Sequence, residues 1–165
     1  MASDDEIQFH LSIDSRFENI ELVQVVLNDV LERLGLEEDT RHWMDLATRE
    51  AVANAIKHGN RSEPGTRVDV ELLRVEGEVV VTIADRGPGF DPGEVGDPLA
   101  PENLLRPSGR GLFYMQSFMD RVEFAARDGG GTVVTLGKQV SGVSQQTPAA
   151  PEGAADDMDS GGDGA

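Results

Sequence analysis

The sequence predicts an α+β fold: a two-layer sandwich in which a mixed, mostly antiparallel sheet carries its helices on one face. The expected order of elements is strand, helix, helix, strand, strand, helix, strand, strand, without the strict alternation of a parallel doubly wound sheet. Strand-like segments meet at tight turns that contain glycine, which is typical of antiparallel hairpins. The chain has 165 residues and 38% hydrophobic content, enough for one compact domain and too little for two.

Three segments build the first half of this order. Residues 6–14 alternate apolar and polar side chains, as a half-buried strand does. Residues 19–36 carry an apolar stripe at helical spacing that stops at Gly35. A second helix is expected to begin near Asp39 or Thr40 and to continue until Gly59.

The second half consists of two hairpins separated by a short helix. Residues 67–75 and 78–85 are expected to pair around the Glu76-Gly77 turn. The short helix and the two strands of the second hairpin are expected at 111–119, 121–126 and 132–138.

Charge and composition exclude several classes of function. With 14 basic and 31 acidic residues the net charge is −17, so neither nucleic acid nor an anionic membrane is expected as a direct partner. Cysteine is absent, which excludes disulfides and thiolate metal sites. We find neither the pattern of a signal peptide nor an apolar run of membrane-spanning length, and therefore expect a cytoplasmic protein.

A shift in composition at Ser141 divides the chain into two parts. Residues 141–165 consist mainly of Ser, Gly, Pro, Ala and acidic residues, without an aromatic or basic side chain. Such a segment buries too little apolar surface to offset the entropy of ordering. We therefore expect a folded domain over residues 1–140 and a disordered acidic tail over 141–165.

The helix that continues until Gly59 carries the first candidate site. In REAVANAIKHGN, residues 49–60, the side chains of Glu50, Asn54 and His58 recur every four residues. In an α-helix this spacing stacks a carboxylate, an amide and an imidazole along one face. The polar outer face of an amphipathic helix explains the same spacing more simply. For His58 we favour a structural role at the helix end over a catalytic one.

Two glycine-rich segments follow. In DRGPGF, Asp85 comes directly after a strand, and Gly87 and Gly89 would let the backbone approach a flat ligand closely. SGRGL, residues 108–112, is expected at a helix start, where free N–H groups and the helix dipole favour phosphate. Taken singly, an ordinary Pro-Gly turn and a common N-cap sequence explain both segments. Together with the polar helix face, they would serve a hydrated metal ion, a base amino group and phosphates.

These motifs resemble those of the GHKL, or Bergerat-fold, ATPases. REAVANAIKHGN is similar to the N box, DRGPGF to the first glycine box, SGRGL to the second and GGTVVTL to the closing strand motif. The resemblance extends from Glu6 to Gln139, with the motifs in the expected order. The ExxxNAxxHG form of the N box, the compact size and the helix SGRGLFYMQSFMD most resemble the anti-sigma factor serine kinases of the sporulation and general-stress switches.

The resemblance implies roles for individual residues toward ATP and Mg²⁺. Glu50 would be the general base, Asn54 would hold Mg²⁺, and Asp85 would accept a hydrogen bond from the adenine amino group. Magnesium prefers oxygen ligands, and a nearby carboxylate can accept the proton of a serine hydroxyl, so the chemistry agrees with these roles. The other residues expected to bind the nucleotide are Gly87, Gly89, Ser108, Gly109, Arg110, Gly111, Leu112 and Thr132. Residues 91–107 are expected to form a lid over it.

The resemblance implies an ATP-dependent protein serine/threonine kinase that acts as an anti-sigma factor. It would phosphorylate an anti-sigma factor antagonist and, in its other state, sequester a sigma factor. An alternative is a nucleotide-gated module that holds a regulatory partner without transferring phosphate, and the sequence does not separate the two. The catalytic domain of a histidine kinase is disfavoured because the single preceding helix offers no phosphoacceptor hairpin. A homodimer is usual in the resembling family.

Overall fold

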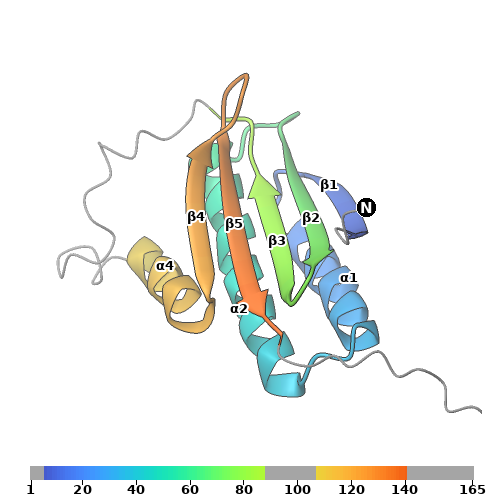
Figure 1. The fold of residues 1–165 in the computed structure, drawn as a ribbon. Helices are drawn as coiled ribbons and strands as arrows, with labels where there is room; N and C mark the ends of the chain where they lie inside the picture. Colours follow the sequence, from blue (N-terminus) through green and yellow to red (C-terminus); the bar gives the residue numbers. More distant parts are fainter. Residues whose placement is uncertain (1–5, 88–106, 141–165) are drawn as a thin grey trace, which may run out of the picture.

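The computed structural model describes residues 6–87 and 107–140, and in its last helix the side chains from Gly111 onward. Figure 1 shows a sheet with α1 and α2 on one face and α4 beside α2 near the β4 edge. The elements are β1 (Glu6–Asp14), α1 (Asn19–Arg33), α2 (Glu38–Asn54), η1 (Ala55–Gly59), β2 (Arg67–Val75), β3 (Glu78–Ala84), α4 (Pro107–Phe118), β4 (Arg121–Ala126) and β5 (Thr132–Gln139).

The five strands form one sheet in the order β1-β2-β3-β5-β4. Every pairing among the described residues is antiparallel. β2 and β3 form the expected hairpin, in which Val75 pairs with Glu78 and Gly77 adopts a φ of 73° at the turn. The α+β class predicted from the sequence is confirmed, and the described sheet is antiparallel throughout rather than mixed.

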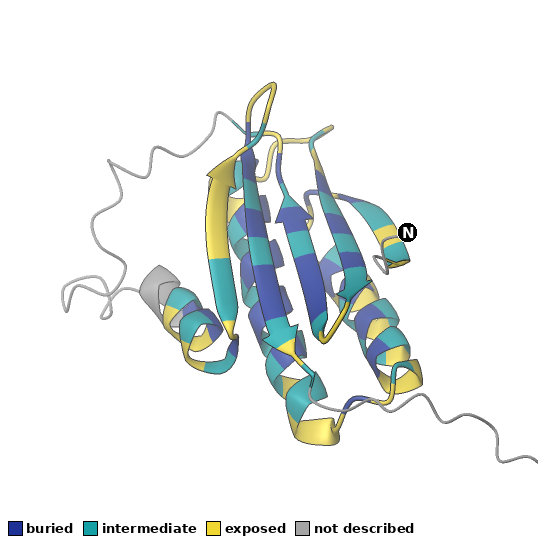
Figure 2. Ribbon diagram, in the orientation of Figure 1, coloured by how far each residue is buried: buried dark blue, intermediate teal, exposed yellow. Residues whose placement is uncertain are grey.

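The hydrophobic core lies between the sheet and the helices (Figure 2). In β2, Val68, Val70 and Leu72 are fully buried, while the residues between them are only partly buried. Because successive side chains of a strand point to opposite faces, this pattern turns one face of the sheet toward the helices. The matching stripe on α1 is Ile20, Val23, Leu27 and Leu31.

Helices α2 and α4 pack antiparallel to each other. Near the C-terminal end of α2, Gly111 of α4 approaches the Glu50 carboxylate. About two turns away on both helices, the Trp43 ring stacks on Phe118, with ring centroids 3.5 Å apart and ring planes 7° apart. Met115, between these two contacts, is fully buried. The two contacts set the position of α4 on α2.

Several helix boundaries differ from the predicted ones. α1 ends at Arg33, and α4 begins at Pro107 rather than at Gly111, so that SGRGL lies within its first turns. α2 changes after Asn54 into a single π-helical turn, Ala55–Gly59, in which the helix widens. The N–H of the residue that follows donates to the Ala55 carbonyl oxygen at 2.8 Å, the i→i−5 bond that defines this turn.

Candidate functional site

The predicted site residues lie along α2 and at the strand ends that its C-terminal end reaches. Figure 1 shows α2 running along the sheet to the edge where β3 ends and β5 begins. Glu50 and Asn54 are half-buried on this helix, whereas His58, in the π-turn, is exposed. The three polar side chains that were predicted to share one face therefore lie in different environments.

Asp85 follows β3 directly, and its side chain is the buried acid of the site, with only 5% exposure. Its Oδ1 accepts hydrogen bonds from the backbone N–H of Gly87 at 3.1 Å and of Thr132 at 3.2 Å. Burial raises the pKa of the Asp85 carboxyl, while these two N–H groups and the Arg127 guanidinium oppose the rise. Both hydrogen bonds described for this carboxylate end on Oδ1, so Oδ2 keeps its capacity to accept another.

Gly59, the last residue of the π-turn, brings the end of the helix against Asp85. A Cβ atom added at Gly59 would overlap the Asp85 carboxylate, with Oδ2 the nearest atom. Only glycine allows so close an approach, because it carries no side chain. Asp85 Oδ2 therefore lies beside the helix on which Asn54 is placed, just before the π-turn.

The closing strand β5 holds Asp85 from the other side. Asp85 N donates to the Thr132 carbonyl oxygen at 3.0 Å, and Thr132 N donates to the carboxylate, so the two residues are joined twice. The Arg127 guanidinium donates to the Asp85 carbonyl oxygen at 3.3 Å and to Asp69 Oδ2 at 3.4 Å. The backbone and side chain of Asp85 are both fixed before any ligand binds.

Glu50 is placed by the packing of α4 on α2. A Cβ atom added at Gly111 would stand 2.6 Å from Glu50 Oε2. The absence of a side chain at Gly111 therefore lets the second glycine-rich segment lie against this carboxylate. Asn54 lies on α2 between the Gly111 contact and the Gly59 contact. One stretch of helix thus carries a carboxylate and an amide between Asp85 and the start of α4.

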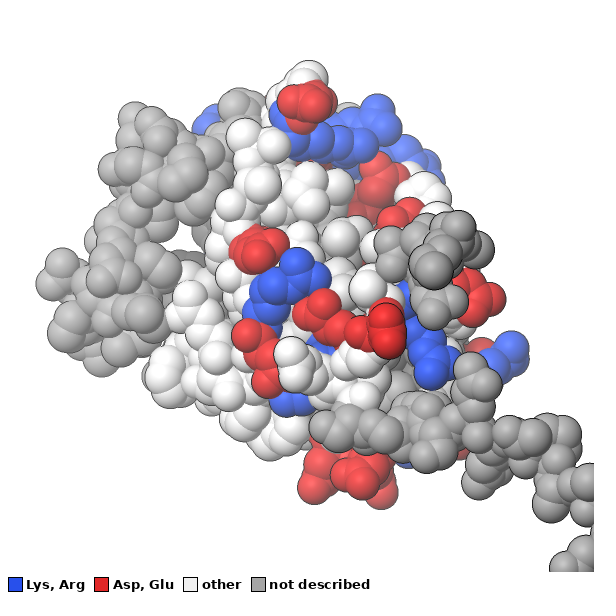
Figure 3. Space-filling view, in the orientation of Figure 1, with Lys and Arg blue, Asp and Glu red and all other residues white. Residues whose placement is uncertain are grey.

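Basic side chains gather at this end of an otherwise acidic molecule (Figure 3). Asp69, on β2, forms ion pairs with Arg86 at 3.9 Å and with Arg127 at 3.4 Å. Two arginines thus share the Asp69 carboxylate close to Asp85.

The remaining predicted site residues fall into two groups. Leu112 is half-buried in α4. The backbone of residues 107–110 forms the first turn of α4, where helix N–H groups lack intrahelical partners. Outside the described residues or side chains lie Gly89, Ser108, Arg110 and residues 91–106 of the predicted lid.

Asn60 and Arg127 belong to this site and were not predicted from the sequence. Asn60 is only 2% exposed, and its amide contacts the residue that follows Asp85. Its place after the glycine at a helix end is a weak signal, because asparagine is common at such positions. Arg127 had no signal, because its partners Asp85 and Asp69 lie 42 and 58 residues away in the chain.

The described residues contain no cluster of three or more His, Cys, Asp or Glu side chains that could hold a metal ion. A magnesium ion at Asn54 would therefore need phosphate oxygens and water to complete its shell, which is the coordination that Mg²⁺ commonly adopts. Within the same part of the chain, none of the helices has the length and apolar character needed to cross a membrane.

Comparison with known proteins identifies the family. Residues 13–138 match the model of the histidine kinase-like ATPase domain. The anti-sigma F factor of Geobacillus kaustophilus is 32% identical over 138 residues, covering 81% of this chain and 93% of that protein. The serine-protein kinase RsbW of Listeria monocytogenes is 28% identical over 134 residues, covering 76% of this chain and 83% of the relative.

A solved structure shares the fold. It contains the RsbU and RsbW domains of a Mycobacterium tuberculosis protein and matches with a TM-score of 0.57 and 20% identity, over 80% of this chain and 32% of that one. The family model covers most of the chain. The matched residues include Asp85 with its partners Gly87 and Thr132, and also Glu50 and Gly111. The chain belongs to the histidine kinase-like ATPase domain family.

Proposed function

We propose that this protein is an ATP-dependent protein serine/threonine kinase that acts as an anti-sigma factor. It phosphorylates an anti-sigma factor antagonist and sequesters a sigma factor in a partner-switching pathway. The names of its relatives, a serine-protein kinase and an anti-sigma F factor, support this proposal. The observation that carries it is the arrangement of Glu50, Asn54 and Asp85 along one helix and the strand end it contacts.

In this proposal Asp85 recognises adenine. Oδ1 is occupied by the N–H groups of Gly87 and Thr132, so Oδ2 is the atom that accepts a hydrogen bond from the adenine amino group. Gly59 carries no side chain that could cover Oδ2, although its backbone lies against this oxygen. Fixing the carboxylate in advance lowers the entropy that is lost on binding.

Asn54 and the start of α4 serve the phosphates. The side-chain oxygen of Asn54 is a suitable ligand for Mg²⁺, which would supply positive charge to neutralise the transferred group. The N–H groups in the first turn of α4 have no helical partners and are available to phosphate oxygens. In this assignment Ser108, Gly109, Arg110 and Gly111 bind phosphate.

Glu50 is the general base of the proposed reaction. Its carboxylate is half-buried, next to Gly111 and about one turn from Asn54, and so lies at the phosphate end of the site. Glu50 would take the proton of a serine hydroxyl as the new bond to phosphorus forms, while the bond to the ADP oxygen breaks. The required order of events is therefore binding of the acceptor chain beside Glu50, proton transfer and release of ADP.

A phosphorylation assay tests the proposal. Radiolabelled Mg-ATP is incubated with candidate antagonist proteins and with wild type, Asn54→Ala or Glu50→Gln protein. Glu50→Gln keeps the shape beside Gly111, so ATP affinity should be retained while labelling slows by at least about 100-fold, the usual contribution of a general base. Glu38→Gln, at the exposed start of the same helix, is the matched control and should label at the wild-type rate.

The outcomes separate the two candidate functions. Equal labelling by Glu50→Gln and wild type would show that Glu50 is not the base. If wild type binds ATP, retains a protein partner and labels nothing, the nucleotide-gated binding module replaces the kinase. This second function remains a candidate because one group of relatives is named anti-sigma F factor, a name that describes binding of a regulator.

A further inference from the structure

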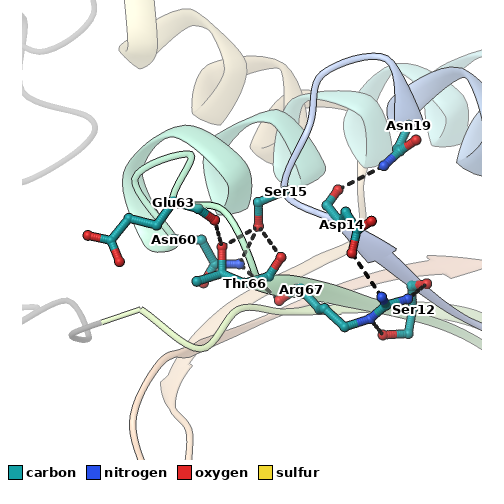
Figure 4. Close-up of polar contacts among 8 residues, drawn as sticks. All are labelled: Ser12, Asp14, Ser15, Asn19, Asn60, Glu63, Thr66 and Arg67. Carbon is teal, nitrogen blue, oxygen red and sulfur yellow. Dashed lines mark hydrogen bonds and ion pairs between the residues drawn. The ribbon is translucent and has the colours of Figure 1, made fainter.

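Asn60 is a buried amide that joins three separate segments of the chain. Its Nδ2 donates to Ser15 Oγ at 2.8 Å and to the Arg67 carbonyl oxygen at 2.9 Å (Figure 4). Its Oδ1 accepts from the Arg86 backbone N–H at 2.9 Å. The amide has one consistent orientation, because exchanging its oxygen and nitrogen would set donor against donor at Arg86.

The third of these contacts lies directly beside the adenine-recognising carboxylate of the proposed function. Arg86 follows Asp85 in the chain, and Gly87 donates its N–H to Asp85 Oδ1 at 3.1 Å. A Cβ atom added at Gly87 would overlap the Gly59 carbonyl oxygen, so the turn lies against the backbone that leads into Asn60. Asn60 is therefore the side chain that links this turn to the end of the helix.

The ion pair described for the Arg86 side chain is weaker than this contact. The Arg86 side chain is 65% exposed, and its ion pair with Asp69 is 3.9 Å long, so water screens it strongly. The hydrogen bond from Arg86 N to Asn60 Oδ1 is shorter and only partly exposed to water. Of the two contacts of Arg86 it is thus the better restraint on the turn, and it acts beside the two bonds that join Asp85 to Thr132.

The other end of the network keeps Asn60 itself in place. Ser15 Oγ donates to the Thr66 carbonyl oxygen at 3.1 Å and accepts from Thr66 Oγ1 at 2.8 Å. Directly after Asn60, Arg61 and Ser62 both adopt a φ of 52°, a conformation that non-glycine residues hold only when their surroundings require it. The Asn60 amide is thus held between the residue that follows β1, the first residue of β2 and a strained turn.

We propose that Asn60 is a positioning residue for base recognition: its amide holds Arg86 N and so aims Asp85 Oδ2 at the amino group of adenine. The inference rests on the proposed ATP-binding function and adds to it a determinant of base specificity. Asn60 itself does not contact the nucleotide. It acts through the backbone of the Asp85–Gly87 turn.

The test compares ATP with purine riboside triphosphate, which lacks the amino group, by calorimetry in the presence of Mg²⁺. Wild type should bind ATP at least about tenfold more tightly, as expected for one hydrogen bond to a charged acceptor. Asn60→Ala should lose most of this preference, so that the ratio of the two dissociation constants falls to about two, within the weak end of a single hydrogen bond. A role in folding alone would weaken both ligands equally and leave the ratio unchanged.

A control variant separates positioning from general loss of structure. Asn19→Ala removes an amide of the same kind, which donates to the Asp14 carbonyl oxygen at 3.0 Å and does not touch the Asp85 turn. It should keep the wild-type ratio, even if it unfolds at a lower denaturant concentration.

The possible results are all decisive. An unchanged ratio in folded Asn60→Ala overturns the proposal while leaving ATP binding intact. If wild type binds neither nucleotide, the proposed function fails and this inference fails with it. Should Asn60→Ala not fold, hydrogen exchange of the wild-type protein decides: protection of the Arg86 N–H, increased by Mg-ATP, supports the proposal, and exchange at the rate of an open turn refutes it.

Discussion

Replacing Asp85 with asparagine is the sharpest test of the candidate site, because it changes one atom and one charge. The Gly87 and Thr132 N–H groups both donate to Oδ1. An asparagine must therefore keep its oxygen at the Oδ1 position and place its NH₂ group where Oδ2 stands, beside Gly59. In Asp85→Asn, a donor replaces the acceptor that we assign to the adenine amino group.

The size of the effect follows from this geometry. A hydrogen bond to a charged acceptor contributes about 1.5–3 kcal/mol, so its loss should raise the dissociation constant of ATP by about 10- to 100-fold. The free energy of unfolding should not fall, because both backbone N–H groups keep their partner and a buried charge, whose unfavourable burial raises the Asp85 pKa, is removed. Binding and stability should therefore move independently.

Calorimetry with Mg-ATP measures the first quantity and urea unfolding the second. Inosine triphosphate adds a check, since its oxygen at the corresponding position accepts a hydrogen bond and should gain affinity relative to ATP in the variant. An exposed acid provides the matched control: Asp29→Asn, on α1, should change neither affinity nor base preference. Undiminished ATP affinity in well-folded Asp85→Asn would refute the assignment of Oδ2 to adenine.

Two further predictions concern stability. Because the folded-state pKa of Asp85 lies above the ordinary value of 3.8, the native state binds more protons there than the unfolded state. As pH rises from 3.8 through the folded-state pKa, urea unfolding should show wild type losing stability relative to Asp85→Asn, with a constant difference at higher pH. Phe118→Ala should cost about 2 kcal/mol by loss of apolar contact and stacking, and alter the fluorescence of Trp43, the single tryptophan. Phe113→Ala, at an exposed position of the same helix, should change the stability and the Trp43 fluorescence much less. A loss of stability equal to that of Phe118→Ala would show that the Trp43 stack does not hold α4.

Local sequence patterns determined the elements of this protein well. β1 has the predicted bounds, the hairpin turns at Gly77, and the order of strands and helices is the predicted one. These features depend on side-chain periodicity and on turn residues, which act over a few neighbouring positions. The resemblance of its motifs to GHKL ATPases rests on similarly short segments, and the family match confirms it. The roles assigned to Glu50, Asn54 and the glycine-box residues remain predictions.

Tertiary structure alone decided how these elements meet. The order β1-β2-β3-β5-β4 places β5 between β3 and β4, which brings Thr132 to Asp85. The π-turn that sets Gly59 against Asp85 has no signal in a sequence that reads as continuous α-helix. The Asn60 amide belongs to the site because it forms hydrogen bonds with Ser15 and Arg86, which are both distant from it in the chain. Burial and hydrogen bonding between such residues depend on long-range packing, which periodicity within a single segment does not predict.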